Sequence, residues 1–156
     1  MSAKPPAKSR PNRAARPAPP AQEMMAVAIP ADGYVPGVCN IGPWEIRRRR
    51  LFGILGLATG LVLFVALTAR GAPPLARLVL LFPFWGGTFS WLQARRRFCA
   101  AFAMDGITNF GEGEATRRQV VDEAAHRADM QAVMRMTRDS FVIGLAITAV
   151  AIVLPL

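Results

Sequence analysis

Side chains that carry chemistry in small proteins are scarce in this sequence. Its 156 residues include one histidine, His126, and two cysteines, Cys39 and Cys99, neither of which lies in a Cys-X-X-Cys motif. A structural zinc site takes about four cysteine or histidine ligands, and a disulfide scaffold takes several cysteine pairs. The composition therefore argues against a metal centre within one copy of the chain and against a disulfide-rich fold.

The short motifs of common active sites are also missing. The chain has no phosphate-binding GxxxxGKS loop, no GxGxxG, no GxSxG and no HExxH. Glu45 is expected to form an ion pair with Arg48 or Arg49 along one helical turn, which is a structural role. We predict no catalytic residue, no metal site, no cofactor and no enzymatic activity.

Charge is absent from long apolar stretches. Residues 51–69 contain no charged side chain and would reach about 28 Å as a helix, which matches the hydrocarbon core of a bilayer. Residues 74–94 contain only Arg77, and residues 141–156 contain none, although the latter would reach only about 24 Å. We therefore predict an all-α membrane protein with an antiparallel transmembrane hairpin over 51–69 and 74–94 and a third, C-terminal span over 141–156.

The second predicted helix has two irregular features. Pro83 removes a backbone hydrogen bond in the middle of the span and is followed by Gly86 and Gly87, so we expect a kink there. Arg77 lies in the first turn and is expected to extend its guanidinium to the lipid headgroups. The many aromatic residues of this helix favour lipid contact over a cofactor groove.

Residues 95–139 are polar and are expected to form a cytoplasmic loop and an amphipathic helix. The second helix is expected to continue through the string FCAAFAM, residues 98–104, before glycines break it. Helix-forming residues then run from 116 to 138. Their weakly apolar face, which we expect to lie on the second helix or on the membrane surface, consists of Val121, Ala125, Ala128, Ala132 and Met136.

The first fifty residues differ from the rest of the chain. Residues 1–29 are basic, rich in proline and alanine, and without an apolar period, so we expect a disordered cytoplasmic tail. A tail of this kind can bind anionic lipid or nucleic acid, although a solvated linker is the commoner role. Residues 30–50 are expected to form a juxtamembrane turn and the start of the first helix, at Pro43.

The basic residues predict an orientation. Of the 19 lysines and arginines, all except Arg70 and Arg77 lie on one side of the predicted spans. The positive-inside rule therefore places the N-terminus and residues 95–139 in the cytoplasm and the C-terminus outside. The clusters that set this topology, and that are expected to attract anionic lipid rather than nucleic acid, are Arg47, Arg48, Arg49, Arg50, Arg95, Arg96 and Arg97.

Two sets of residues are candidates for contacts or chemistry. Gly53, Gly56 and Gly60 recur on one face of the first span, a pattern that lets helices approach closely, although glycine is also common in membrane helices generally. Cys39 and Cys99 both fall near the predicted cytoplasmic interface, where thiols stay reduced. They are either a pair used for redox or metal chemistry or simply two packed thiols.

The most distinctive string is YVPGVCNIGPWEIRRRR, residues 34–50. Together with the strings FCAAFAMDG and NFG after the second span, it resembles the juxtamembrane signature of uncharacterised small bacterial membrane proteins. Their shared pattern is VCNIGP, an acidic residue and a basic run before the first span. The resemblance implies the membrane topology and a location in the bacterial inner membrane, and it implies no activity.

The function that best fits these features is a non-enzymatic accessory or interaction subunit of a membrane assembly. Its expected partners are the lipid bilayer and either other membrane proteins or a second copy of the chain. The glycine face of the first span and the segment 98–139 are the expected contact surfaces. The alternative is a thiol-based redox or metal-binding membrane protein that uses Cys39 and Cys99.

Overall fold

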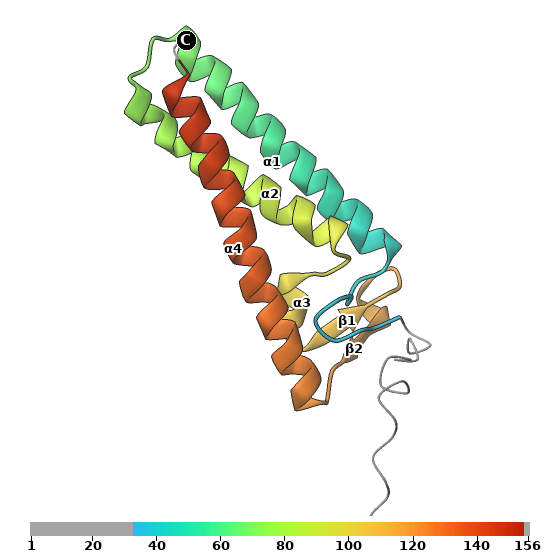
Figure 1. The fold of residues 1–156 in the computed structure, drawn as a ribbon. Coiled ribbons are helices and arrows are strands. Elements are labelled where there is room, and N and C mark those ends of the chain that lie inside the picture. The colour runs from blue at the N-terminus through green and yellow to red at the C-terminus, as the bar shows by residue number, and fades with distance from the viewer. Residues whose placement is uncertain (1–32, 155–156) are drawn as a thin grey trace, which may run out of the picture.

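The computed structural model describes residues 33–154, and within this range three helices are long and apolar enough to cross a membrane (Figure 1). The three apolar helices predicted from the sequence are thus confirmed, whereas the predicted tail, residues 1–29, lies outside the described residues. The second helix is continuous but begins with a 3₁₀ segment. The bounds are Pro43–Ala69 for α1, Pro74–Leu80 for the 3₁₀ helix η1, Leu81–Arg95 for α2 and Glu123–Val153 for α4.

The helix α2 lies between α1 and α4. It packs along both of them, whereas α1 and α4 have no comparable interface with each other (Figure 1). Along the seam between α1 and α2, Gly53 lies against Trp91 and Gly60 lies against Phe84. Because residue numbers rise along one helix as they fall along the other, α1 and α2 run in opposite directions.

The helices place small and polar side chains inside and large apolar side chains outside. In α4 the buried positions include Ser140, Gly144 and Thr148. The two hydroxyls donate within the helix, to the carbonyls of Thr137 and Gly144, each at 2.8 Å. This distribution is the reverse of a water-soluble helix and is expected where lipid tails are the solvent. The large apolar side chains left exposed on α4 are Met134, Phe141, Val142, Ile143, Leu145, Ile147, Val150 and Val153.

At the N-terminal ends of α1 and α4 the chain forms a cap, which we define as residues 33–42 and 96–122 (Figure 1). In the cap, β1 and β2 pair antiparallel with Thr108 opposite Arg118, and Ile41 adds a parallel bridge to Asn109. The chain is therefore mostly helical rather than all-α. The elements of the cap are α3 (Ala100–Met104), β1 (Ile107–Asn109), the 3₁₀ turn η2 (Glu114–Thr116) and β2 (Arg117–Gln119).

The second predicted helix ends earlier than expected. The helix α2 stops at Arg95, and Arg97 turns the chain with a φ of 51° before α3 begins. The carbonyl of Arg97 accepts hydrogen bonds from the backbone N–H groups of Asn40 and Ile41, at 3.1 and 3.3 Å. The prediction that the helix continues through residues 98–104 is wrong, because contacts with a distant segment replace the helical hydrogen bonds.

The amphipathic helix and the third span are one helix, α4. It begins at Glu123, where the carboxylate of Asp122 caps the first turn by accepting two backbone N–H groups, and it runs without a break to Val153. Separate helices over 116–138 and 141–156 were the expectation, and they are corrected because no glycine or proline interrupts the chain between them. The buried positions follow helical spacing throughout and are Ala125, Asp129, Ala132, Met136, Ser140, Gly144, Thr148 and Ala151.

Arg77 is buried rather than extended toward headgroups. Only 3% of its surface is exposed, and Nη1 donates to the carbonyls of Ala151 and Leu154, each at 2.9 Å. The guanidinium also lies 5.6 Å from the ring of Phe64. The last carbonyls of a helix lack helical partners and carry partial negative charge, so they attract a cation. The expectation for Arg77 is therefore wrong, because the end of α4 supplies acceptors inside the protein.

Pro83 lies near the middle of the continuous helical stretch 74–95, as the sequence predicts. It is the third residue of α2, and the change from 3₁₀ to α winding occurs before it, between Leu80 and Leu81. A proline has no N–H group to donate to the preceding helical turn, and the winding changes within that turn. There Leu80 is fully buried in a cluster with Phe84, and the kink itself stays a prediction.

Candidate functional site

The segment 34–42, which contains most of the distinctive string, is joined to α4 by a buried carboxylate. Tyr34 Oη donates to Asp129 Oδ2 at 2.8 Å, and the backbone N–H of Gly37 donates to Asp129 Oδ1 at 2.6 Å. Asp129 lies on α4 and is fully buried. A buried carboxylate is costly unless such donors satisfy it. Asp129 therefore holds the start of this segment against α4.

Asn40 joins the same segment to α3 and to β1. Its Oδ1 accepts the N–H of Cys99 at 2.6 Å, and its Nδ2 donates to the carbonyl of Cys99 at 3.0 Å. The backbone of Asn109 bonds to the carbonyl of Asn40 and to the N–H of Gly42. Gly42 has to lack a side chain, because a Cβ there would collide with the carbonyl of Phe110. The string VCNIGP thus forms a structural junction between α1 and the cap.

The two cysteines lie at this junction as free thiols. Cys39 is half-buried and Cys99 is fully buried. Burial raises the pKa of both thiols, and the guanidinium of Arg49, whose Nη2 lies 2.9 Å from Cys99 Sγ, opposes this rise for Cys99 only in part. Thiols held in the protonated form are weak nucleophiles and weak metal ligands. Within residues 33–154, no group of three His, Cys, Asp or Glu side chains is placed to hold a metal ion.

Glu45 forms the ion pair with Arg48 that its spacing predicts, with 3.9 Å between Oε1 and Nη1. The carboxylate side chain is almost fully buried, while Arg48 is half exposed and lies over the rings of Trp44 and Phe52 at 5.9 and 5.7 Å. An ion pair with one exposed member stabilises a helix by only a few tenths of a kcal/mol, roughly. Arg48 therefore already has partners on its own face of α1, namely a carboxylate and two aromatic rings.

A groove of about 940 Å³ opens beside the junction, between the first two turns of α1 and the end of α2. Arginines from both helices and from the turn after α2 line it. Within the part of the chain that the structure describes, Arg96 alone of this set has an acidic partner, Asp139 Oδ2 at 2.7 Å. We name this feature the arginine groove, and its arginines are Arg47, Arg50, Arg95, Arg96 and Arg97.

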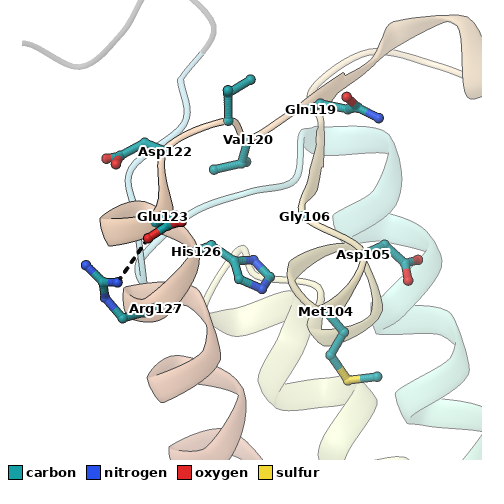
Figure 2. Close-up of a pocket in the computed structure, with 10 residues that line it drawn as sticks. Met104, Asp105, Gly106, Gln119, Val120, Asp122, Glu123, His126 and Arg127 are labelled. Atoms are coloured by element: carbon teal, nitrogen blue, oxygen red, sulfur yellow. Dashed lines mark ion pairs between the residues drawn. The ribbon is translucent and has the colours of Figure 1, made fainter.

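A more open pocket of about 660 Å³ lies at the end of the cap where α4 begins (Figure 2). Met104 and the turn at Gly106 form one side, and the linker from β2 into α4 forms the other. Figure 2 shows His126 projecting between the two sides. Met104 and Val121 line the pocket and are 60% and 91% exposed. We name it the distal pocket.

The predicted site residues are thus distributed over several places. His126 lies in the distal pocket, away from the two cysteines at the junction, so the structure does not bring these three possible ligands together. The glycine face of α1 is covered by α2, because a Cβ on Gly56 would lie 2.7 Å from the Cα of Gly87. The expectation that this face binds a partner protein is therefore corrected.

Sequence reasoning missed the side chains that hold the junction together. A signal for Asp129 was present, because it falls in register with Ala125 and Ala132 on the apolar face of the amphipathic helix. A carboxylate on such a face needs a buried partner. Asn40 and Asn109 gave no comparable signal, because their partners are brought to them only by the tertiary fold.

Comparison with known proteins gave no match: no family model, no curated protein and no solved structure matches this chain. The function is therefore inferred from the side chains and surfaces described above. The arginine groove and the distal pocket are the two concave surfaces with chemically distinctive linings among them. One is strongly cationic, and the other combines exposed apolar groups with a histidine and carboxylates.

Proposed function

We propose that this protein is a non-enzymatic, multi-pass protein of the bacterial inner membrane that serves as an accessory or interaction subunit of a membrane assembly. Three helices of sufficient length and hydropathy support the membrane location, as does their outward display of large apolar side chains. The positive-inside rule supports a cytoplasmic cap, with Arg70 and Arg77 at the opposite, external end. The cap is then the part of the protein that soluble domains of a partner can reach.

The observation that carries this proposal is the presence of two exposed apolar side chains, Met104 and Val121, in the mainly polar lining of the distal pocket. Val121 is 91% exposed and Met104 is 60% exposed, and both line the same concave surface. Single exposed apolar residues are ordinary, but apolar residues that converge on one pocket mark binding surfaces. A protein segment with an apolar side chain and a nearby basic group would match this lining and the adjacent Asp105.

Lipid is not the natural occupant of this pocket. His126 precedes the apolar part of α4, which starts at Phe141, by 15 residues, or about 22 Å along a helix. The pocket therefore lies well outside the hydrocarbon core when residues 141–153 are in it. An exposed apolar lining at this distance has water as its alternative contact, so a protein partner would gain free energy by covering it.

The proposal is tested by photo-crosslinking in intact cells with the full chain. A photoreactive residue is placed at Met104, at Val121 or, as the control, at Glu114, which is exposed on η2 outside the pocket. We expect the two pocket positions to give the same discrete crosslinked product and the control position to give none. Val121→Asp should remove the product obtained from position 104, because it places a charge in the apolar lining.

Two results would contradict the proposal. One is the absence of any discrete product from both pocket positions while the chain is expressed and folded. The other is an equal product from position 114, which would indicate collision rather than binding. A product of twice the mass of the chain would identify a second copy as the partner.

A thiol-based function of Cys39 and Cys99 is the weaker proposal. The contact between Arg49 Nη2 and Cys99 Sγ favours it, because a nearby cation stabilises a thiolate. Burial acts against it by raising the pKa of both thiols. The two effects together leave the interaction role as the function that the geometry supports best.

A further inference from the structure

The arginine groove concentrates positive charge that the protein itself does not neutralise. Within residues 33–154, no acidic side chain pairs with Arg47, Arg50, Arg95 or Arg97. Like charges that line one groove repel one another, although these arginines are exposed and salt screens part of the repulsion. A bound anion would remove this unfavourable energy.

Several arginines outside the groove differ from most of those in it, because each has an acidic partner. Outside the groove, several arginines have a carboxylate within ion-pairing distance. These pairs are Arg48 with Glu45, Arg117 with Glu114 and Arg127 with Glu123. Within the described residues, Arg96 alone of the groove arginines has a carboxylate within ion-pairing distance, so the groove keeps a net positive charge.

Arg97 occupies a backbone conformation that is unfavourable for an arginine. Its φ of 51° lies in the left-handed region, and among the described residues it is the sole non-glycine residue there. Glycine or asparagine adopts this conformation with less strain. The carbonyl of Arg97 is held by the N–H groups of Asn40 and Ile41, so the turn is fixed and the side chain is delivered to the groove. The fold therefore places Arg97 in the lining of the groove at a cost in backbone strain.

The start of α1 adds to the positive potential of the groove. Gly42 and Pro43 both line it, and Gly42 is the N-cap of the helix and has no side chain to cap it. The first N–H groups of a helix carry partial positive charge and favour anions. The carboxylate of Glu45, buried in the same first turn, offsets part of this charge, so the arginines supply most of the positive potential of the groove.

The position of the groove identifies the anion. Arg50 directly precedes the uncharged run that starts at Leu51, and Arg95 directly follows the one that ends at Ala94. Both therefore lie at the depth of lipid phosphates when α1 and α2 span a bilayer. Ile46 and Ala94 add apolar surface to the lining. We propose that the arginine groove binds the phosphate headgroup of an anionic phospholipid from the same leaflet, a site beyond the partner-binding role of the distal pocket.

The test uses the purified full chain in a neutral detergent, titrated with phosphatidylglycerol, phosphatidylcholine or inorganic phosphate. The lipid-induced rise in unfolding temperature gives an apparent affinity, and native mass spectrometry counts retained lipid molecules. We expect phosphatidylglycerol to stabilise the protein and to be retained, and the other two probes to have little effect. Raised salt should weaken the effect.

Variants separate a built site from general surface charge. Arg50→Gln and Arg97→Asn should each lower the apparent affinity for phosphatidylglycerol roughly fivefold. Arg48→Gln removes the same charge from the same helix outside the groove and should change the affinity less than twofold. Asparagine at position 97 suits the left-handed backbone, so this variant should fold at least as stably as the parent without lipid.

Several results would overturn the proposal. Equal losses from Arg48→Gln and Arg50→Gln would mean that diffuse electrostatics, and not the groove, attracts the lipid. Equal stabilisation by phosphatidylcholine would remove the anion from the explanation. Equal stabilisation by inorganic phosphate would make the ligand a soluble anion. These outcomes are independent of crosslinking at the distal pocket, which lies at the other end of the cap.

Discussion

The hydrogen bond between Tyr34 and Asp129 joins residues that are 95 positions apart in the chain. It satisfies one oxygen of a fully buried carboxylate, and the N–H of Gly37 satisfies the other. Hydrogen bonds to charged groups contribute more to stability than bonds between neutral groups, because a buried charge without a partner has a large desolvation cost. This one polar residue of α4 therefore positions the start of the segment that precedes α1.

Removal of the phenol hydroxyl tests this assignment. Tyr34→Phe should lower the free energy of unfolding by about 1.5 kcal/mol, because Asp129 loses one donor while its desolvation remains. Unfolding in detergent by heat or denaturant measures the change. In an Asp129→Asn background the same substitution should cost much less. An equal cost in both backgrounds would show that the two side chains are not coupled.

The same hydrogen bond predicts a dependence on pH. Burial, together with the hydrogen bond to Asp129 and its negative charge, raises the pKa of Tyr34 above its ordinary value of 10.0. The neutral phenol is thus favoured in the folded state, so its contribution is fully present below pH 10 and is lost as the pH rises through the raised pKa. Tyr34 is the only tyrosine of the chain, so tyrosinate absorbance follows it directly. Titration at the ordinary value in the folded protein would contradict the assignment.

At the scale of elements, the packing of α1 on α2 depends on glycines that face each other. A Cβ on Gly87 would lie 2.7 Å from the backbone nitrogen of Leu57, and a Cβ on Gly56 would lie equally close to Gly87. Close backbone approach of this kind is how helices gain packing energy in lipid, where burial of apolar surface gives little. The glycines of α1 thus hold the protein's own second helix.

Two adjacent glycines of α2 provide a matched test. Gly87→Ala should lower the free energy of unfolding by about 1–3 kcal/mol, because the new Cβ forces α1 and α2 apart. Gly86→Ala should be neutral or stabilise by about 0.5–1 kcal/mol, because open space surrounds that position and alanine favours helix. Thermal unfolding in detergent measures both. Similar effects from the two substitutions would argue against the close α1–α2 contact.

At the scale of the whole molecule, the cap and the loop between α1 and η1 lie at opposite ends of the helices (Figure 1). Most described arginines lie at the end that carries the cap, so the proposed orientation places the cap in the cytoplasm. The orientation also decides which lipid leaflet the arginine groove contacts, and in the proposed orientation this is the cytoplasmic leaflet.

Cysteine accessibility in intact cells tests the orientation. Ala72→Cys lies in the loop after α1, and Glu114→Cys lies in η2 of the cap. A membrane-impermeant maleimide should label position 72 in intact cells and position 114 only after permeabilisation. The native thiols should react slowly, because burial raises their pKa. Labelling of position 114 alone in intact cells would reverse the proposed topology.

The sequence predicted those features that depend on local composition. The three apolar segments follow from hydropathy, because each needs only its own residues to exclude water. The pair of Glu45 with Arg48 follows in the same way from helical spacing. The early end of α2 was missed because it arises from hydrogen bonds with the segment 34–42. The small sheet was missed because its two strands are only three residues long each.

By itself, the sequence determined that this chain has three membrane-length apolar helices and an asymmetric distribution of cations. Hydropathy and charge act at each position regardless of what folds against it. Only the tertiary structure decided that Arg77 closes the end of α4, that Gly56 meets Gly87, and that arginines from two helices line one groove. Each of these depends on residues far apart in the chain, whose approach is set by packing and not by composition.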